Sequence, residues 1–388
     1  MKVASGLTQG RRAEPALAAR AVREAMERAG LTHAQAVLLY LSTDFAHDPQ
    51  PAITAAARAA NCLQVAGCTA AGVFSEEDWV LDAPAAAVLV LGDGLSVQPT
   101  VADSDPVLTF AAPNALDLHW LMGGGARFGG VSGDTSGQGP YTVWSGGRAQ
   151  HGGRCELALA GADLRVGVSQ GVHPLSQPAN IGQVEGHDVR VVGGQAALSS
   201  LVRELPLSVR APERIPTHLL MAGVTYGAPE HAVEEGRFHL LPVISANPAD
   251  RSVTVAGQLT PGLDLFWAMR QPRAAEHDMR AMLGRLAQGQ TDKPRFGLIF
   301  PCMGRGPYFY GGVDRDLQIL KQTFPGMPFA GFYGNGEIAH LDGANRLLQY
   351  SVVLGLGYDP VAPAPPPARS IKPTNAGGGA GAMQAGAP

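Results

Sequence analysis

The sequence has few cysteines and no long apolar run, and each shortage excludes a class of protein. Only 4 of the 388 residues are cysteine, and no two of them form a Cys-x-x-Cys pair. This is too few to staple so long a chain, so we expect reduced thiols and a cytoplasmic protein. The longest apolar run, 83–91, is far shorter than the roughly 20 residues that span a bilayer. Because the N-terminus also lacks a signal-peptide core, we expect neither export nor a membrane anchor.

Charge is also sparse. Charged residues make up 16% of the chain, the net charge is −4, and Lys and Arg form no block. Nucleic acids and anionic membranes both require a concentrated positive surface, so neither is expected as a partner. The histidines lack metal-ligand spacing to another His, Cys or carboxylate, and residues 123–125 lack the Lys-Ser/Thr ending of a phosphate loop. We therefore expect neither a metal nor a cofactor.

Apolar residues and glycine are abundant instead. An apolar fraction of 45% over 388 residues predicts a globular protein too large for one ordinary core. Residues 36–42 and 85–91 read as strands covered on both faces, and 51–60 as an alanine-rich helix. The predicted fold class is α/β, with two related lobes of mixed sheets and crossover helices.

The order strand, helix, strand, glycine corner and strand occurs twice. Residues 295–300 and 327–330 are the predicted strands of the second copy, with a helix over 314–323 between them and a further strand over 347–356. The corners run from Gly67 to Gly72 and from Gly331 to Gly336, and a looser copy spans 128–134. This recurrence predicts an internal duplication of α/β units with parallel strands. Glycine lets another group approach the backbone closely, so the corners favour binding over chemistry.

The middle of the chain reads as richer in strands. Residues 238–244 and 252–256 predict a hairpin, and 276–287 a helix. The polar, glycine-bounded segment 227–236 is the predicted hinge. The predicted domains are accordingly 1–228 and 229–358, followed by a disordered Pro/Gly/Ala-rich tail over 359–388.

Polar residues follow two strands of the predicted second unit. Cys302 and Arg305 follow the strand over 296–300, and Gly336 and Glu337 follow the next. Ligands bind beyond the carboxyl ends of strands in open α/β sheets, so these residues are expected to share a pocket. Arg305 would bind the carboxylate of a free amino acid and Glu337 its ammonium group. The alternative is an Arg305–Glu337 ion pair that only ties two loops together.

Two other functions stay open. A thiol-dependent hydrolase or transferase would use Cys302, whose thiolate Arg305 would favour, with His340 as a candidate base. Free cysteine is, however, among the most buried residue types, so a packed or ligand-lining thiol is preferred and no catalytic residue is predicted. A protein-interaction scaffold would instead use the tail over 360–388 as its contact.

The motifs that carry the polar residues resemble those of the FIST family. Cys302-x-Gly304-Arg305-Gly306, Tyr310 and Gly331-Phe332-Tyr333-x-x-Gly336-Glu337-Ile338 resemble the FIST C-terminal domain. Gly67-Cys68-Thr69 with Gly72, and the Gly129-Gly130 corner, resemble the FIST N-terminal domain, and the resemblance covers about residues 30–356. Because no kinase, receiver or DNA-binding segment is fused to this chain, any signal is expected to pass to a separate, unidentified protein. The resemblance implies a sensory protein of bacterial signal transduction that binds a small ligand, with amino acids the proposed ligands. The binding residues that this implies are Cys68, Thr69, Gly130, Asp134, Arg270, Cys302, Arg305, Gly336 and Glu337.

Some of these residues also have simpler readings. Cys68 and Thr69 are small enough for a tight corner, and Asp134 can cap its own turn. Arg270 can equally be a surface residue near Trp267. The chain also departs from the family at Ala339-His340, where the family tends to have a proline, so the exit of this loop is expected to differ.

Overall fold

The continuous apolar runs form strands that are buried on both faces. β2 (Ala36–Ser42) and β6 (Ala85–Gly92) are buried at every residue and pair antiparallel. Amphipathic segments form the covering helices, as in α1 (Pro15–Ala29), which has proline in its first turn and ends at Gly30 in the left-handed conformation. The computed structural model describes the chain except residues 101–105, 211–214, 229, 361–385 and 387–388, so the predicted tail lies almost entirely outside the described residues.

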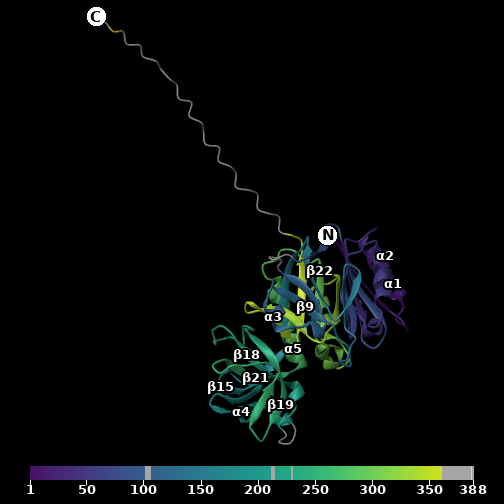
Figure 1. Cartoon of the computed structure of the whole chain (residues 1–388). Coiled ribbons are helices and arrows are strands. Elements are labelled where there is room, and N and C mark those ends of the chain that lie inside the picture. Colours follow the sequence, from purple (N-terminus) through teal and green to yellow (C-terminus); the bar gives the residue numbers. More distant parts are fainter. Residues whose placement is uncertain (101–105, 211–214, 229, 361–385, 387–388) are drawn as a thin grey trace.

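The fold class is α/β, with mixed sheets and helices arranged in two lobes (Figure 1). The larger lobe contains three six-stranded sheets. The first holds β1 (Lys2–Gln9), β6, β2, β3 (Val65–Ala70), β10 (Thr142–Ser145) and β11 (Arg148–His151). The second holds β25 (Ala344–Leu348), β24 (Glu337–Leu341), β9 (Arg127–Val131), β8 (Val107–Ala111), β12 (Arg154–Ala160) and β7 (Ser96–Pro99). The third holds β13 (Asp163–Ser169), β26 (Val352–Tyr358), β22 (Phe296–Pro301), β23 (Phe329–Tyr333), β4 (Gly72–Ser75) and β5 (Trp79–Val80).

One succession of elements is repeated in all three sheets. The strand orders β1-β6-β2-β3, β7-β12-β8-β9 and β13-β26-β22-β23 correspond, and in each the last two strands are parallel. The chain crosses between these parallel strands through α2 (Gln50–Ala60), α3 (Leu118–Met122) and α6 (Arg315–Thr323), respectively. The predicted duplication is therefore confirmed, and the second sheet adds a third copy. We call these copies the first, second and third repeats.

Each repeat closes its parallel pair with a glycine. The three glycines are Gly67, Gly129 and Gly331, opposite Leu39, Thr109 and Ile299. A Cβ atom on any of them would lie 1.8 or 1.9 Å from the carbonyl oxygen of the residue opposite. These corner glycines are thus required by the close approach of two strands, whether or not a ligand binds there.

The space enclosed by the three corners is filled with side chains. Tyr40, Phe110 and Phe300 follow the residues opposite the corner glycines, and their ring centroids lie 5.6, 5.8 and 6.3 Å apart. All three rings belong to one buried cluster that draws on all three sheets. The centre of the larger lobe is therefore a packed aromatic core.

The smaller lobe closes on itself. Its strand β21 (Asp264–Arg270) pairs with both β15 (Ala179–Glu185) and β18 (Leu220–Thr225). Between β15 and β18 the sheet continues through β16, β20 and β19, and the predicted hairpin is confirmed as β19–β20. The remaining elements are β14 (Val172–Pro174), β16 (Asp188–Val192), β17 (Gln195–Ala196), α4 (Ala197–Glu204), β19 (Phe238–Asn247) and β20 (Ser252–Val255).

The smaller lobe is an insertion into the third repeat. In the first repeat, residues 10–14 join β1 to α1, whereas in the third, residues 170–271 join β13 to α5 (Pro272–Ala287). The chain passes between the lobes at residues 170–171 and again at 270–271, and these passages are adjacent because Val172 pairs with Arg270. We call them the hinge strands.

Two predictions about this half of the chain are wrong. Residues 227–236 join β18 to β19 inside the smaller lobe and do not link the lobes, since a polar, glycine-bounded loop suits a hairpin as well as a hinge. The spatial lobes therefore do not divide at 228/229. Residues 347–356 are not one strand, because Tyr350 takes a left-handed φ of 58° between β25 and β26.

Candidate functional site

A groove of about 440 Å³ lies where the two lobes meet. Helix α5 forms its wall on the larger lobe, and β14 and residues 233–238 form the wall on the smaller lobe. Figure 1 shows α5 at this junction. A cavity of this size, lined by two lobes that are joined by two strands, is the kind of place in which small ligands bind.

The two faces of α5 have different roles. Its buried face packs on the third sheet through Ala275, Met279, Met282, Leu283 and Leu286. The opposite face presents Arg273, His277, Ala281 and Arg285 to the groove at intervals of four residues. Residues at this spacing follow one another along one side of a helix, so two guanidinium groups and an imidazole line the same wall.

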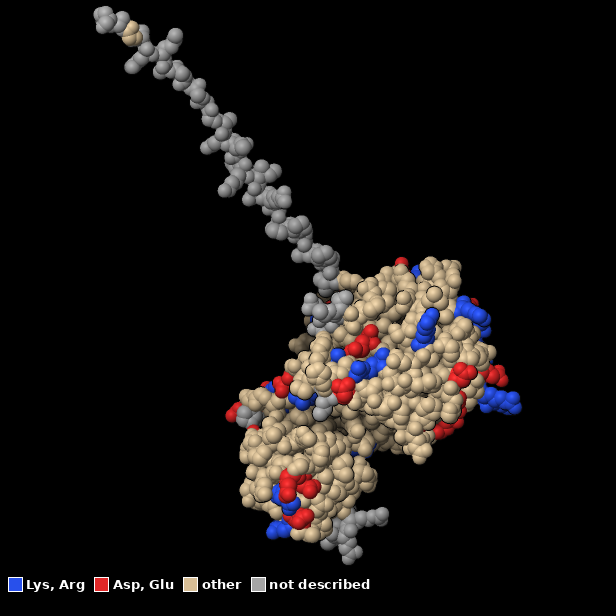
Figure 2. All heavy atoms as spheres, in the orientation of Figure 1, with Lys and Arg blue, Asp and Glu red and all other residues tan. Residues whose placement is uncertain are grey.

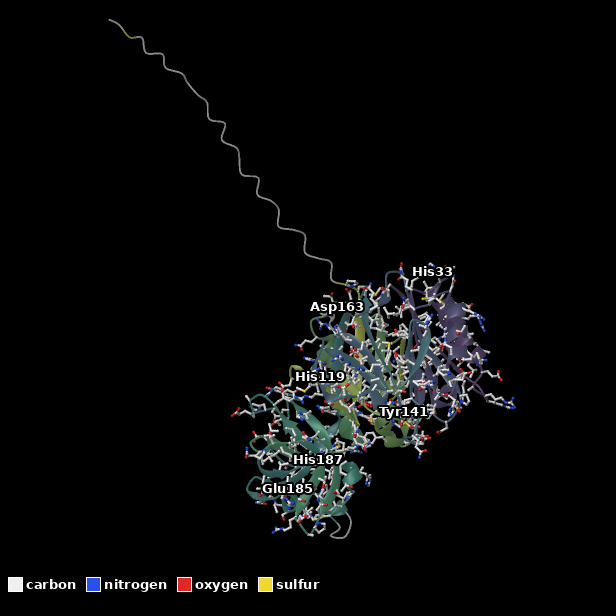
Figure 3. The ribbon with its side chains drawn as sticks, viewed as in Figure 1. His33, His119, Tyr141, Asp163, Glu185 and His187 are labelled. Carbon is white, nitrogen blue, oxygen red and sulfur yellow. The ribbon has the colours of Figure 1, made fainter. Side chains whose placement is uncertain are left out.

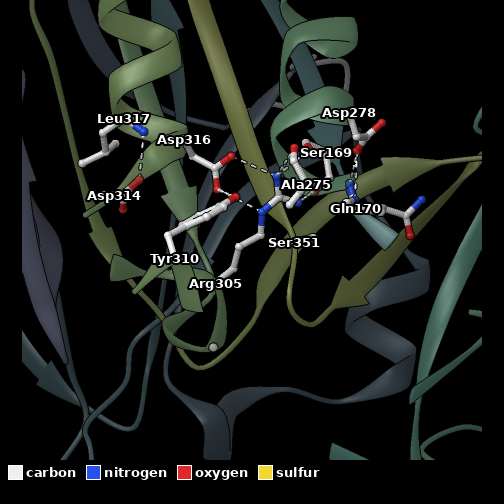
Figure 4. A network of polar contacts seen from close by, with 12 residues as sticks. Ser169, Gln170, Ala275, Asp278, Arg305, Tyr310, Asp314, Asp316, Leu317 and Ser351 are labelled. Atoms are coloured by element: carbon white, nitrogen blue, oxygen red, sulfur yellow. Dashed lines mark hydrogen bonds and ion pairs between the residues drawn. The ribbon is translucent and has the colours of Figure 1, made fainter. Parts of the chain in front are cut away.

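A buried arginine bonds to β13, α5 and α6 (Figure 4). Arg305, which is 1% exposed, forms an ion pair with Asp316 through Nε and Nη2, at 2.9 and 3.0 Å. It also donates to the Ser169 backbone oxygen and Oγ, at 2.9 and 2.8 Å, and to the Ala275 carbonyl at 3.1 Å. Burial alone would lower the pKa of Arg305, and the Asp316 carboxylate raises it above its usual value. Arg305 therefore remains charged and ties β13 to α5.

Asp278 of α5 binds the hinge strand from the other side (Figure 4). Its Oδ2 accepts hydrogen bonds from Ser169 Oγ at 2.8 Å, from the Gln170 N–H at 2.7 Å and from the Gly171 N–H at 3.0 Å. Gln170 Nε2 in turn donates to the Phe238 carbonyl of the smaller lobe, at 2.8 Å. The hinge strand is thereby held to both walls of the groove.

Arg270 holds the second hinge strand. Its guanidinium donates to the His218 carbonyl of the smaller lobe at 3.1 Å and to the Gly304 carbonyl of the larger lobe. It also stacks on Tyr350, with 3.8 Å between Cζ and the ring centroid. Burial lowers its pKa. Arg270 is thus a contact between the lobes, and the simpler reading as a surface residue does not hold.

Cys302, Glu337 and Ser351 form a second buried group. Glu337 Oε2 accepts hydrogen bonds from Ser351 Oγ at 2.6 Å and from the Ser351 N–H at 3.2 Å. Burial raises the pKa of Glu337 to about 8. Burial also raises the pKa of the adjacent Cys302 thiol above its usual value, and the Glu337 charge raises it further. Among the described residues Glu337 forms no ion pair with Arg305, so the predicted loop-tying pair is wrong.

The first repeat serves as an internal reference for these polar groups. A short helix follows β22 (Met303–Arg305) and another follows β2 (Thr43–Phe45). Their third residues, Arg305 and Phe45, are both buried. Asp278 is the seventh residue of α5, and Ala21 is the seventh residue of α1. The scaffold therefore folds with apolar groups at these positions, and the polar network is specific to the repeat that carries the smaller lobe.

Glu337 differs in the same way from its counterparts. In each sheet the residue after the corner glycine pairs with a neighbouring strand. These residues are Gly130, Phe332 and Cys68, and their partners are Glu337, Val73 and Val143, respectively. All three are buried. A carboxyl group thus replaces a valine at a position where the fold itself requires only an apolar side chain.

The other predicted binding residues lie apart from the groove. Cys68 and Thr69 are buried in β3, where Thr69 Oγ1 lies 3.3 Å from Ser132 Oγ and burial raises the Cys68 pKa. A side chain at Gly130 would collide with the Phe332 ring, and the carbonyl of Gly336 accepts from the Val131 N–H.

Asp134 organises its own loop. Its carboxylate accepts hydrogen bonds from the N–H groups of Gly137 and Gly139, at 2.6 and 2.8 Å, and from Ser136 Oγ at 2.7 Å. Burial acts to raise the pKa of Asp134, but these hydrogen bonds outweigh it and the pKa is lowered. This is the turn-capping arrangement that the sequence also predicted.

Titratable and charged side chains are spread over the molecule. His33, His119 and His187 lie in separate parts of it (Figure 3), and no group of three or more His, Cys, Asp or Glu residues among the described ones could hold a metal ion. On the face shown in Figure 2 both signs of charge are interspersed, and the surface narrows between the lobes. No helix in the described part of the chain combines the length and apolar character needed to cross a bilayer.

The residues that line the groove are not among the binding residues predicted from the sequence. The spacing predicts a helix over 276–287, whereas the helix begins at Pro272 and so includes Arg273. The signal was the proline in the first turn together with the four-residue spacing of Arg273, His277 and Arg285. The second wall could not be found in this way, because the smaller lobe is distant in sequence from the helix it faces.

Comparison with known proteins gives matches over most of the chain. Residues 35–195 match the FIST N domain and residues 197–340 the FIST C domain. An uncharacterized protein of Mycobacterium tuberculosis (strain CDC 1551 / Oshkosh) is 26% identical over 390 residues, which cover 92% of this chain and 100% of the relative. An uncharacterized protein of Mycobacterium bovis is 28% identical over 193 residues, 50% of each chain. Human (Homo sapiens) F-box only protein 22 is 38% identical over 61 residues, 15% of this chain and 14% of its own.

Proposed function

Because this chain belongs to the FIST family, we propose that it is a bacterial, cytoplasmic sensory protein that binds an amino acid in the groove between its lobes. FIST domains are associated with sensory signal transduction. The bound state is read by a separate signalling protein.

The groove is the observation that carries this proposal. Its volume of about 440 Å³ lies within the range of small-molecule sites. Its lining includes Arg273 and Arg285 as cations and Glu234 and Asp278 as anions, so both charges of a free amino acid find a counterpart. Apolar side chains such as Val233 and Phe238 complete the wall of the smaller lobe.

The position of the groove supports a sensory role. In the described part of the chain only two adjacent strands cross between the lobes. A ligand that touches both walls therefore favours the lobe arrangement in which both contacts are made. Arg305 and Arg270 are proposed to transmit this preference. Arg305 bonds to Ser169, next to the first hinge strand, and Arg270 belongs to the second hinge strand and bonds to Gly304 of the larger lobe. Cys302 and Glu337 are proposed to support the loop that carries Arg305.

For the remaining predicted binding residues we propose a role in the scaffold and not in direct contact with the ligand. Cys68, Thr69, Gly130, Asp134 and Gly336 shape the corners of the larger lobe against which the third repeat packs. Their proposed part is therefore indirect, through the scaffold that holds the groove wall.

Thiol catalysis at Cys302 has weaker support. A cysteine nucleophile needs a lowered pKa and a nearby base. Burial and the Glu337 charge instead raise the Cys302 pKa, and His340 bonds to Asn345 at 3.1 Å. The scaffold alternative rests on residues 360–388, nearly all of which lie outside the described residues.

A thermal-shift screen against the free amino acids tests the proposal. Saturation with a ligand that binds only the folded state, at 100 times its Kd, stabilises by about 2.7 kcal/mol. At least one amino acid is expected to raise the unfolding midpoint of the wild type. Ala281→Trp fills the groove and is expected to abolish that rise, whereas Arg280→Trp, exposed and outside the groove, is expected to preserve it. Failure of every amino acid, or an unchanged response in Ala281→Trp, would contradict the proposal.

A further inference from the structure

The charges that line the groove differ in how far they are already neutralised. Asp278 is bound by one hydroxyl and two backbone N–H groups, and Glu234 lies 2.9 Å from His231 Nδ1. Arg273, His277 and Arg285 have no hydrogen bond or ion pair from their side chains to any other described residue. The groove therefore offers two unpaired guanidinium groups and one unpaired imidazole. Asp278 is largely engaged, whereas Glu234, 79% exposed, has only the exposed His231 as its partner in the described part of the chain.

Helix α1 offers a comparison for the charges of α5. It is the counterpart of α5 in the first repeat, and the residues that correspond to His277, Ala281 and Arg285 are Arg20, Glu24 and Arg28. There Arg20 lies 4.0 Å from Glu24, and Arg28 pairs with Glu77 at 2.5 Å. These two arginines of α1 are thus compensated by carboxylates, whereas no such partner is present for Arg273 and Arg285 of α5 among the described residues.

We propose that the ligand is an acidic amino acid, an inference that rests on the proposed function of the groove. Arg273 and His277 are one helical turn apart, about 5–6 Å between Cβ atoms, which suits the two carboxylates of glutamate or aspartate. Glu234, on the opposite wall, faces the ligand's ammonium group. Arg285 lies about 18 Å from Arg273 along the helix and contributes only a longer-range attraction.

This arrangement also explains why the ligand must touch both lobes. The carboxylates bind α5 of the larger lobe, and the ammonium group binds residues 233–238 of the smaller lobe. An anion without an ammonium group would occupy the α5 wall alone. The amino group is then the part of the ligand that couples binding to the lobe arrangement.

Isothermal titration of the full chain with L-glutamate and L-glutamine tests the charge preference, because the two differ little in shape. Glutamate is expected to bind at least tenfold more tightly. Arg273→Gln and His277→Gln are each expected to weaken glutamate binding at least tenfold, and Arg285→Gln by less. Arg280→Gln, on the same helix but outside the groove, should leave it unchanged.

Glutarate, which lacks the amino group, tests the opposite wall. Glu234→Gln is expected to weaken glutamate binding several-fold and to leave glutarate binding unchanged. Equal affinities for glutamate and glutamine, or equal losses in Arg273→Gln and Arg280→Gln, would overturn the inference while amino-acid binding itself stood. Inorganic phosphate binding as tightly as glutamate would reduce the site to a general anion site and overturn it as well. Binding of neither glutamate nor glutamine refutes the inference, and the wider amino-acid screen then decides the function.

Discussion

Replacement of Arg305 by phenylalanine is expected to lower the free energy of unfolding by about 3–5 kcal/mol, the usual result of leaving one partner of a buried ion pair unpaired. Asp316, which is fully buried, would keep its carboxylate without the guanidinium that bonds to it twice. The Ser169 and Ala275 carbonyls would lose a donor as well. Urea denaturation of the wild type and the variant measures the loss.

A double variant separates the charge from the packing. Phenylalanine is the residue of the first repeat at this position, and Asp316→Ala removes the carboxylate that Arg305→Phe leaves unpaired. Arg305→Phe with Asp316→Ala is therefore expected to be more stable than Arg305→Phe alone. Arg315→Ala, half-exposed and 3.9 Å from Glu276, is the control and should cost at most about 1 kcal/mol. A double variant no more stable than the single one would show that the ion pair is not the reason for the loss.

The free energy of unfolding is expected to fall as the pH rises from about 4.5 to about 8, in part because of Glu337. In the unfolded chain this carboxyl loses its proton near its ordinary pKa of 4.5, whereas burial raises the folded pKa to about 8. Between these values the folded state binds one proton more than the unfolded state, so each pH unit costs up to about 1.4 kcal/mol. The stabilising effect of the neutral acid is fully present at low pH and is lost as the pH rises.

Glu337→Gln tests this contribution against the rest of the protein. Asp314, whose pKa burial raises to about 7, acts in the same direction and is present in both proteins. Urea denaturation at pH 5, 6.5 and 8 should therefore give a shallower decline for Glu337→Gln than for the wild type. Glu24→Gln, at a partly exposed position, should decline as the wild type does. Equal slopes for the wild type and Glu337→Gln would show that Glu337 is not the titrating group.

Glu337→Val gives the residue that the other repeats use. Val73 and Val143 are buried at the corresponding positions, so the valine side chain suits this part of the scaffold. Packing alone therefore does not require an ionisable group at position 337. Here the group lies beside the loop of Cys302 and Arg305, which holds the first hinge strand.

Local patterns were enough for most of the scaffold. The strand over 36–42 and the helix that follows it were found from apolar runs and spacing, because neighbouring residues alone decide which face of such a segment is buried. The corner glycines are predictable because close backbone approach requires glycine, and glycine at a fixed spacing can be recognised in the sequence. The duplication was visible for the same reason.

The partner of each polar side chain was not visible in this way. Arg305 and Glu337 were both identified, but their pairing was not, since Asp316 and Ser351 carry no motif of their own. The hinge was misplaced because a polar loop between glycines has the same local chemistry in a hairpin as in a linker.

The amino-acid order alone determined the α/β class, the buried strands, the glycine corners and the family, because each of these depends on residues close together in the chain. Only the tertiary structure decided that the repeat is threefold, that the smaller lobe is inserted between β13 and α5, and that a groove lies between them. The physical reason is that a groove and a buried ion pair are made by surfaces that meet only after folding, so no local pattern encodes which surface faces which.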